Sequence, residues 1–220
     1  MKRLAVILLT ACIMLSFSSC GVSDALLTYL GFDTYDYEGE AVTANLSGDE
    51  AVIEKLTEMT KILTLNSPIL PEFDKTSEAV SSCRDSVLNY MLCTGFSKYT
   101  GNPELMEAAE KEYPDLRIIT VIPAEDFENF IYTYFGGNVK LSNESSELFT
   151  YLDKVDAYTA VSVPVENNVE ISVISCEETA RTYRFVFRNI LGDVESPVYR
   201  ALVIKREDGS LYFKSLKSID

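Results

Sequence analysis

The sequence predicts an α+β fold in which N-terminal helices pack on a C-terminal twisted antiparallel sheet, built as a meander. Three observations support this prediction. Between residues 47 and 135, apolar side chains recur mainly at helical spacing. From residue 155 onward they recur at every second position, which is the spacing of strands. Near the C-terminus, Asp208-Gly209 is a strong signal for a tight turn between two strands. Helices followed by a run of strands are typical of α+β domains.

Three helices are expected before residue 114. The first follows a capping box at Ser47-Gly48-Asp49-Glu50. The second begins at Thr76 or Ser77 and ends near Gly95. The third is short and starts at Asn102-Pro103, because proline is favoured at the first helical position. The expected inward positions are Val52, Ile53, Leu56, Met59, Ile62 and Leu63 in the first helix, Ala79, Val80, Cys83, Val87, Tyr90 and Met91 in the second, and Leu105, Met106 and Ala109 in the third.

A strand and a fourth helix are expected next. Arg117–Ile122 is rich in β-branched residues and predicts a strand, after which Pro123 can begin a helix. The helix has the strongest apolar stripe in the chain, with positions at i, i+3, i+4, i+7 and i+8, and Gly136-Gly137 ends it. Its stripe consists of Phe127, Phe130, Ile131, Tyr134 and Phe135.

The C-terminal third predicts half-buried antiparallel strands. Apolar and polar residues alternate in three stretches, and Glu177–Ala180 is predicted to be a hairpin connection. The last two strands, Val198–Lys205 and Ser210–Lys217, flank the Asp208-Gly209 turn. The expected inward positions of the earlier strands are Val155, Ala157, Thr159 and Val161, then Val169, Ile171 and Val173, then Tyr183, Phe185 and Phe187.

The first residues have the layout of a secretory signal. Two cations are followed by the apolar run Leu4–Phe17 and then by small residues, and the run is shorter than the roughly 20 residues of a membrane-spanning helix. Phe17-Ser18-Ser19-Cys20 resembles the lipobox of bacterial lipoproteins, with phenylalanine where that family prefers leucine. The resemblance implies cleavage before Cys20 and acylation of its thiol and new amino group. A second possible lipobox, Leu9-Thr10-Ala11-Cys12, leaves too short an apolar segment before its cysteine. The remaining alternatives are a plain signal peptide and an uncleaved membrane anchor.

We therefore expect three parts: a signal peptide at 1–19, a lipidated cysteine with an acidic tether at 20–46, and a single α+β domain at 47–220. Cleavage removes Lys2 and Arg3, which leaves 17 of the 19 basic residues against 34 acidic ones, a net charge of −17. Such a surface repels nucleic acid and anionic lipid, so the expected membrane link is the lipid on Cys20. The expected location is the extracytoplasmic face of the cell membrane.

The sequence contains no histidine. This excludes Ser-His-Asp and Cys-His catalysis and histidine-ligated zinc. Carboxylate chemistry is the remaining possibility, and Asp153, Asp156, Glu166 and Glu170 are the acids near the start of the predicted sheet. No motif supports such a reaction, and the acids between residues 33 and 40 lack the spacing of a calcium loop. We expect no enzymatic activity, no cofactor and no metal.

The chain has five cysteines. On the lipobox interpretation, Cys12 leaves with the signal and Cys20 carries lipid. Cys83 and Cys93 are ten residues apart in one expected helix, which separates them by ~15 Å, too far for a disulfide. Cys83, Cys93 and Cys176 are expected to be buried thiols. The alternative is a disulfide between Cys176 and either Cys83 or Cys93.

The order of elements, with the Ile122–Gly136 helix segment and the Asp208–Ser215 hairpin, resembles small lipoproteins of Gram-positive anaerobes that carry a cystatin-like or nuclear-transport-factor-like domain. The resemblance covers residues 47–220 and implies a cone-like fold. In such a fold a curved sheet and its helices can enclose a pocket. Enzymes and binding modules both use it, so the fold does not decide the function.

We expect a surface binding or interaction module, with a small molecule or a protein as its ligand. The expected pocket lies where the aromatic strand face meets the Phe127–Phe135 helix. A structural or regulatory envelope protein with a protein partner is the second hypothesis, and a carboxylate-only hydrolase or isomerase is the third. The residues proposed for the pocket are Tyr183, Phe185, Phe187, Tyr199 and Tyr212, and the alternative place for the same side chains is the core between sheet and helices.

Overall fold

The computed structural model describes residues 35–74, 76–136 and 141–219. Cys20, the signal segment and the first part of the tether lie outside these residues. The chain divides into two compact units, 1–40 and 41–220. In the described part of the first unit, the hydroxyl of Tyr35 donates to the carboxylate of Glu40, with 2.8 Å between the oxygens. Every described helix and strand belongs to the second unit.

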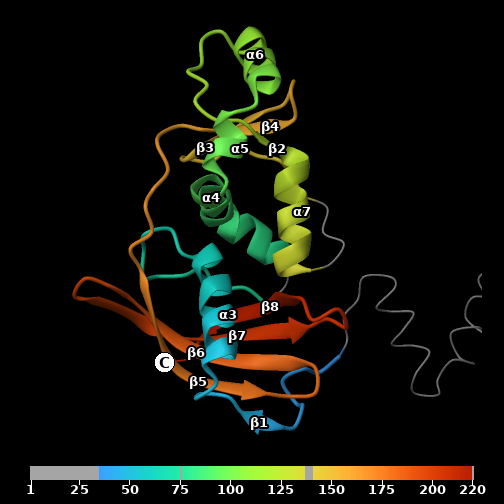
Figure 1. The fold of residues 1–220 in the computed structure, drawn as a ribbon, viewed down its shortest axis with the longest axis vertical. Helices are drawn as coiled ribbons and strands as arrows, with labels where there is room; N and C mark the ends of the chain where they lie inside the picture. The colour runs from blue at the N-terminus through green and yellow to red at the C-terminus, as the bar shows by residue number, and fades with distance from the viewer. Residues whose placement is uncertain (1–34, 75, 137–140, 220) are drawn as a thin grey trace, which may run out of the picture. The chain divides into compact units, whose positions relative to one another are not determined.

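The second unit is α+β, as the sequence predicts (Figure 1). Its strands form two antiparallel sheets, with the orders β1-β5-β6-β7-β8 and β2-β4-β3. The helices are α3 (Glu50–Thr60), the 3₁₀ helix η1 (Lys61–Leu63), α4 (Thr76–Thr94), α5 (Phe96–Thr100), α6 (Pro103–Glu112) and α7 (Ala124–Phe135). The strands are β1 (Ala44–Asn45), β2 (Ile122–Pro123), β3 (Phe149–Leu152), β4 (Ala157–Ala160), β5 (Glu170–Glu178), β6 (Thr182–Leu191), β7 (Val194–Lys205) and β8 (Leu211–Ser218).

The larger sheet contains the predicted meander. Strands β5 to β8 pair with their sequence neighbours, and each connection is a short turn. Gly209 has a φ of 79° in the predicted turn between β7 and β8. Gly192, with a φ of 60°, lies in the turn between β6 and β7, for which no turn was predicted. Glycine adopts this left-handed conformation without steric cost.

The folded unit begins before Ser47, because β1 pairs with the end of β5. Residues 41–46, assigned from the sequence to the tether, therefore belong to the domain. Ser47 is also not the cap of α3. The side chain of Asp49 accepts from the amide of Val52 at 3.1 Å, whereas the hydroxyl of Ser47 accepts from the amide of Cys176 at 3.0 Å. Ser47 thus continues the pairing of β1 with β5, and Asp49, two residues later, is the N-cap of α3.

The smaller sheet differs from the sequence prediction in two ways. Only the end of the predicted Arg117–Ile122 strand pairs with another strand, as β2. Strand β4 is buried on both faces and is not half-buried, because helices pack on both sides of it. Tyr158 packs on Phe127 of α7, while Ala157 joins a small cluster with Ala109 of α6. Val161, predicted to point inward, lies beyond β4 and is 60% exposed.

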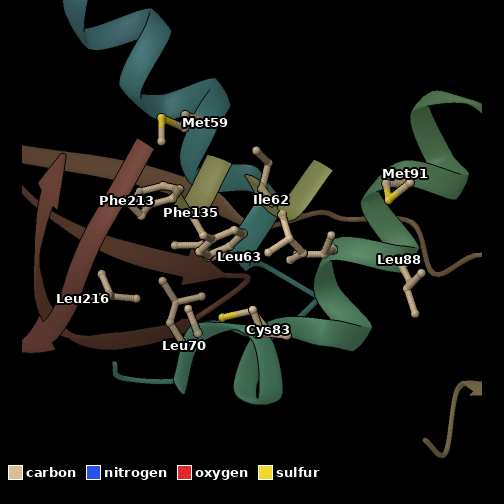
Figure 2. Close-up of a cluster of buried hydrophobic side chains, with 14 of the residues drawn as sticks. Met59, Ile62, Leu63, Leu70, Cys83, Leu88, Met91, Phe135, Phe213 and Leu216 are labelled. Carbon is tan, nitrogen blue, oxygen red and sulfur yellow. The ribbon is translucent and has the colours of Figure 1, made fainter. Parts of the chain in front are cut away.

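Helices α4 and α7 lie between the two sheets (Figure 1). The predicted stripe of α7 is confirmed for Phe127, Ile131 and Phe135, which are fully buried. Figure 2 shows how side chains from α3, α4, α7 and the larger sheet meet in one core. Burial of this apolar surface is the main driving force for such a fold. None of the described helices is long and apolar enough to cross a bilayer.

The three cysteines in the described region are free thiols. Cys83 and Cys93 both lie in α4, as predicted. Cys83 and Cys176 are buried, but Cys93 is exposed, so the prediction of a buried thiol is wrong there. The last turns of α4 present Cys93 to the segment after β4, where its thiol lies 3.6 Å from the carbonyl oxygen of Val165.

Candidate functional site

A pocket of about 340 Å³ opens where α3, α4, α7 and the turn between β7 and β8 meet. This volume falls within the range of roughly 300 to 1,000 Å³ that is usual for small-molecule sites. Four separate segments of the chain build it. Its lining residues are Lys55, Glu58, Met59, Ile62, Tyr90, Thr133, Tyr134, Ser210 and Leu211.

The floor of the pocket is apolar. Met59 and Ile62 come from α3 and η1, and Leu211 is the first residue of β8; all three are buried. Figure 2 shows Met59 and Ile62 among the side chains of the main core. Because Lys55 and Glu58 lie one helical turn from Met59 and Ile62, they share the same side of the helix and bring charge to the rim.

Aromatic rings form one wall. Tyr90 of α4 is 5.9 Å from Phe130 of α7, and Phe130 is 4.5 Å from Tyr134, measured between ring centroids. Burial raises the pKa of Tyr90, and the neighbouring Tyr134 and Glu58 raise it further. The Tyr90 phenol therefore stays neutral at physiological pH and can both donate and accept a hydrogen bond.

The turn between β7 and β8 also lines the pocket, and it is fixed from two sides. The ammonium of Lys55 donates to the carbonyl of Gly209 at 3.1 Å. The guanidinium of Arg206 donates to main-chain carbonyls at the end of α7 and lies over the ring of Tyr212, 4.5 Å from its centroid. Within the turn, the carboxylate of Asp208 accepts from the amide of Ser210 at 2.8 Å. The pKa of Asp208 is lowered chiefly by hydrogen bonding from the Ser210 side chain and then by this bond from the Ser210 amide.

Neither this pocket nor the smaller one described below is lined by the five aromatic residues selected from the sequence. Phe185, Phe187 and Tyr199 are buried in the core between sheet and helices, where Tyr199 accepts a hydrogen bond from the amide of Leu70 at 3.0 Å. Tyr183 is half-buried, with the ammonium of Lys205 5.1 Å from its ring centroid. Tyr212 is half-buried beneath Arg206, next to the lining residue Leu211.

A second hollow, beside Asn89 and Leu92 of α4, has a volume of about 10 Å³. That is room for about one water molecule. It lies next to a close connection in which the side-chain amide of Asn89 both donates to the carbonyl and accepts from the amide of Val165, each at 2.9 Å. The hollow is too small for a ligand.

The four acids considered for carboxylate chemistry are all exposed. The hydroxyl of Tyr113 donates to Asp153, and the hydroxyl of Tyr151 donates to Asp156 at 2.6 Å. The hydrogen bond from Tyr113 lowers the pKa of Asp153, whereas a general acid needs a raised pKa. In the described part of the chain, no group of three or more cysteine, aspartate or glutamate side chains is arranged to hold a metal ion.

No protein-family model matches this chain, and no curated protein or solved structure matches it significantly.

Proposed function

We propose that the protein is a membrane-anchored extracytoplasmic lipoprotein whose α+β domain binds a small molecule with an apolar body. The anchor in this proposal is the lipid on Cys20, supported by the apolar run and the small residues before that cysteine. The ligand site is the pocket between α3, α4, α7 and the β7–β8 turn.

The observation that carries the binding function is the composition of this pocket. An apolar floor of Met59, Ile62 and Leu211 lies beside the rings of Tyr90 and Tyr134. Binding sites for small molecules are mostly apolar, with a few polar groups that fix the orientation of the ligand. Here the tyrosine hydroxyls and Ser210 supply those polar groups.

A cone-like architecture of the cystatin or nuclear-transport-factor type is part of the proposal. It is supported by the pairing of the meander, because each of its three strand pairs contains a shift in register. Bulges of this kind bend a strand and increase its twist, which is how a sheet comes to curve around helices.

The binding function is tested with a neutral probe, 2-(4-fluorophenyl)ethanol, titrated into the full-length protein in phosphatidylcholine nanodiscs and followed by fluorine NMR. Empty nanodiscs give the blank. Tyr134→Ala removes one wall of the pocket and is expected to weaken binding about tenfold, since stacking and apolar contact are lost. Tyr132→Ala makes the same substitution on the same helix outside the pocket and should leave the affinity unchanged. Equal affinities of the two variants would contradict the proposal, as would the absence of binding by both this alcohol and its ammonium analogue.

A further inference from the structure

We infer that the pocket selects ligands that carry a protonated amine on an apolar or aromatic body. This inference rests on the proposed function, because it assigns a ligand class to the same site. It follows from the polar atoms that face the pocket, from the hydrogen bonds that its cations already make, and from the charge of the whole chain.

Hydrogen-bond acceptors of the lining lie near one another, since Glu58 and Tyr134 are both close enough to the Tyr90 phenol to raise its pKa. The carboxylate of Glu58 and the hydroxyls of Tyr90 and Tyr134 all belong to lining residues. Within the described parts of the chain, the two tyrosine hydroxyls make no hydrogen bond to the protein. An ammonium group has three donors and no acceptor, so a pocket lined by these three oxygens suits it well.

The cations near the pocket already donate to protein oxygens. Lys55 donates to the carbonyl of Gly209, and Arg206 donates to the carbonyls of Tyr132 and Thr133. An anionic ligand would have to compete with these bonds, which also hold the wall in place. The nearest cations therefore stabilise the pocket and are poorly placed to bind a carboxylate.

Glu58 is accessible to a ligand even though it pairs with Lys61. The side chains of Lys61 and Glu58 are 40% and 57% exposed, respectively. An ion pair this exposed contributes little to stability, because water screens both charges. A ligand ammonium that also buries an apolar body can displace Lys61 at little cost.

Longer-range electrostatics favour the same choice. The chain carries a net charge of −15, which attracts cations to its surface. The faces of the tyrosine rings are negative, so aromatic walls favour a cation over an anion of the same shape. Both effects add to the local preference set by Glu58.

The test compares three probes that share one ring: 2-(4-fluorophenyl)ethylammonium, 2-(4-fluorophenyl)ethanol and 3-(4-fluorophenyl)propanoate. Each is titrated into the full-length protein in phosphatidylcholine nanodiscs at neutral pH. The ammonium probe is expected to bind about fivefold or more tightly than the alcohol, and the propanoate most weakly. Glu58→Gln should bring the ammonium and alcohol affinities within about twofold of each other. Glu54→Gln, an exposed position one turn earlier on α3, removes the same charge and should keep the preference.

The outcomes separate this inference from the proposed function. If the alcohol and the propanoate bind as tightly as the ammonium, the inference is overturned and the binding function stands. A preference for the ammonium that survives Glu58→Gln also overturns it, because the carboxylate would not be its cause. If none of the three probes binds, the proposed function itself fails.

Discussion

The guanidinium of Arg206 donates a hydrogen bond to the main-chain carbonyl of Thr133, with 3.0 Å between Nη1 and the oxygen. It donates a second bond to the carbonyl of Tyr132 at 2.9 Å, and it also reaches the hydroxyl of Ser210 at 3.2 Å. The last carbonyls of a helix lack partners within the helix, and a cation there also offsets the helix dipole. Arg206 therefore joins the end of α7 to the β7–β8 turn, and both of these segments line the pocket.

Replacement of Arg206 by alanine is expected to lower the free energy of unfolding by about 1 to 2 kcal/mol, because two charge-assisted bonds to carbonyls and the contact with Tyr212 are lost. It should also weaken binding of the neutral fluorinated alcohol, since one wall is no longer held. Urea denaturation and the fluorine NMR titration measure the two effects.

The matched control is Arg117→Ala, an exposed arginine for which the described residues show no ion pair. Exposed substitutions of this kind change stability by less than about 0.5 kcal/mol. If Arg206→Ala were as stable as Arg117→Ala and bound the probe normally, the connecting role of Arg206 would be ruled out.

Stability should fall at alkaline pH because of Cys83. Burial raises the pKa of this thiol from 9.0 to about 12. Between these values the unfolded chain releases the proton while the native chain keeps it, so rising pH favours unfolding; below the lower value the effect is absent. Urea denaturation should be carried out at about pH 8 and about pH 10. The free energy of unfolding should fall between these pH values, and the fall should be about 1 kcal/mol smaller in Cys83→Ala than in the native protein.

Val87→Ala is the control for this measurement. Val87 is buried in the same helix but does not titrate, so its truncation should lower stability equally at both pH values. The same pH-dependent loss in Cys83→Ala as in the native protein would show that the buried thiol does not cause it.

Periodicity in the sequence was enough to predict most of the elements. The apolar spacing of Phe127, Ile131 and Phe135 identifies the buried side of α7, and the alternation at Phe185 and Phe187 identifies the inner face of β6. Burial on both faces of β4 was missed because it depends on α6 and α7, which cover opposite sides of the smaller sheet. Local patterns do not report what packs on the second face of a strand.

The pocket was harder to predict. Its acceptors, Glu58, Tyr90 and Tyr134, lie on three different helices and come together only through tertiary packing. The aromatic strand face predicts either a pocket or a core against the helices, and the large apolar rings of Phe185 and Phe187 lie in the core. One signal was available: Lys55, Met59 and Ile62 share one side of the first helix, with a charge beside apolar positions.

Lipidation is predicted at Cys20, which lies outside the described residues. Cells grown with an alkyne analogue of palmitate should give a labelled protein, and Cys20→Ala should abolish the label. Cys12→Ala replaces the cysteine of the competing box and should leave labelling intact. If the label persisted in Cys20→Ala and disappeared in Cys12→Ala, the lipidated residue would be Cys12 and not Cys20.

The most direct measurement of the central claim is a methyl NMR map of the ligand site. The full-length protein in nanodiscs, labelled at methionine, isoleucine and leucine methyls, would be titrated with 2-(4-fluorophenyl)ethylammonium. Because Met59, Ile62 and Leu211 form the floor of the pocket, their methyl signals should shift together, while Ile118 in the cluster beside the smaller sheet should not. Shifts that leave these three methyls unchanged, or that appear only at Ile118 and its neighbours, would contradict the assignment of the pocket as the ligand site.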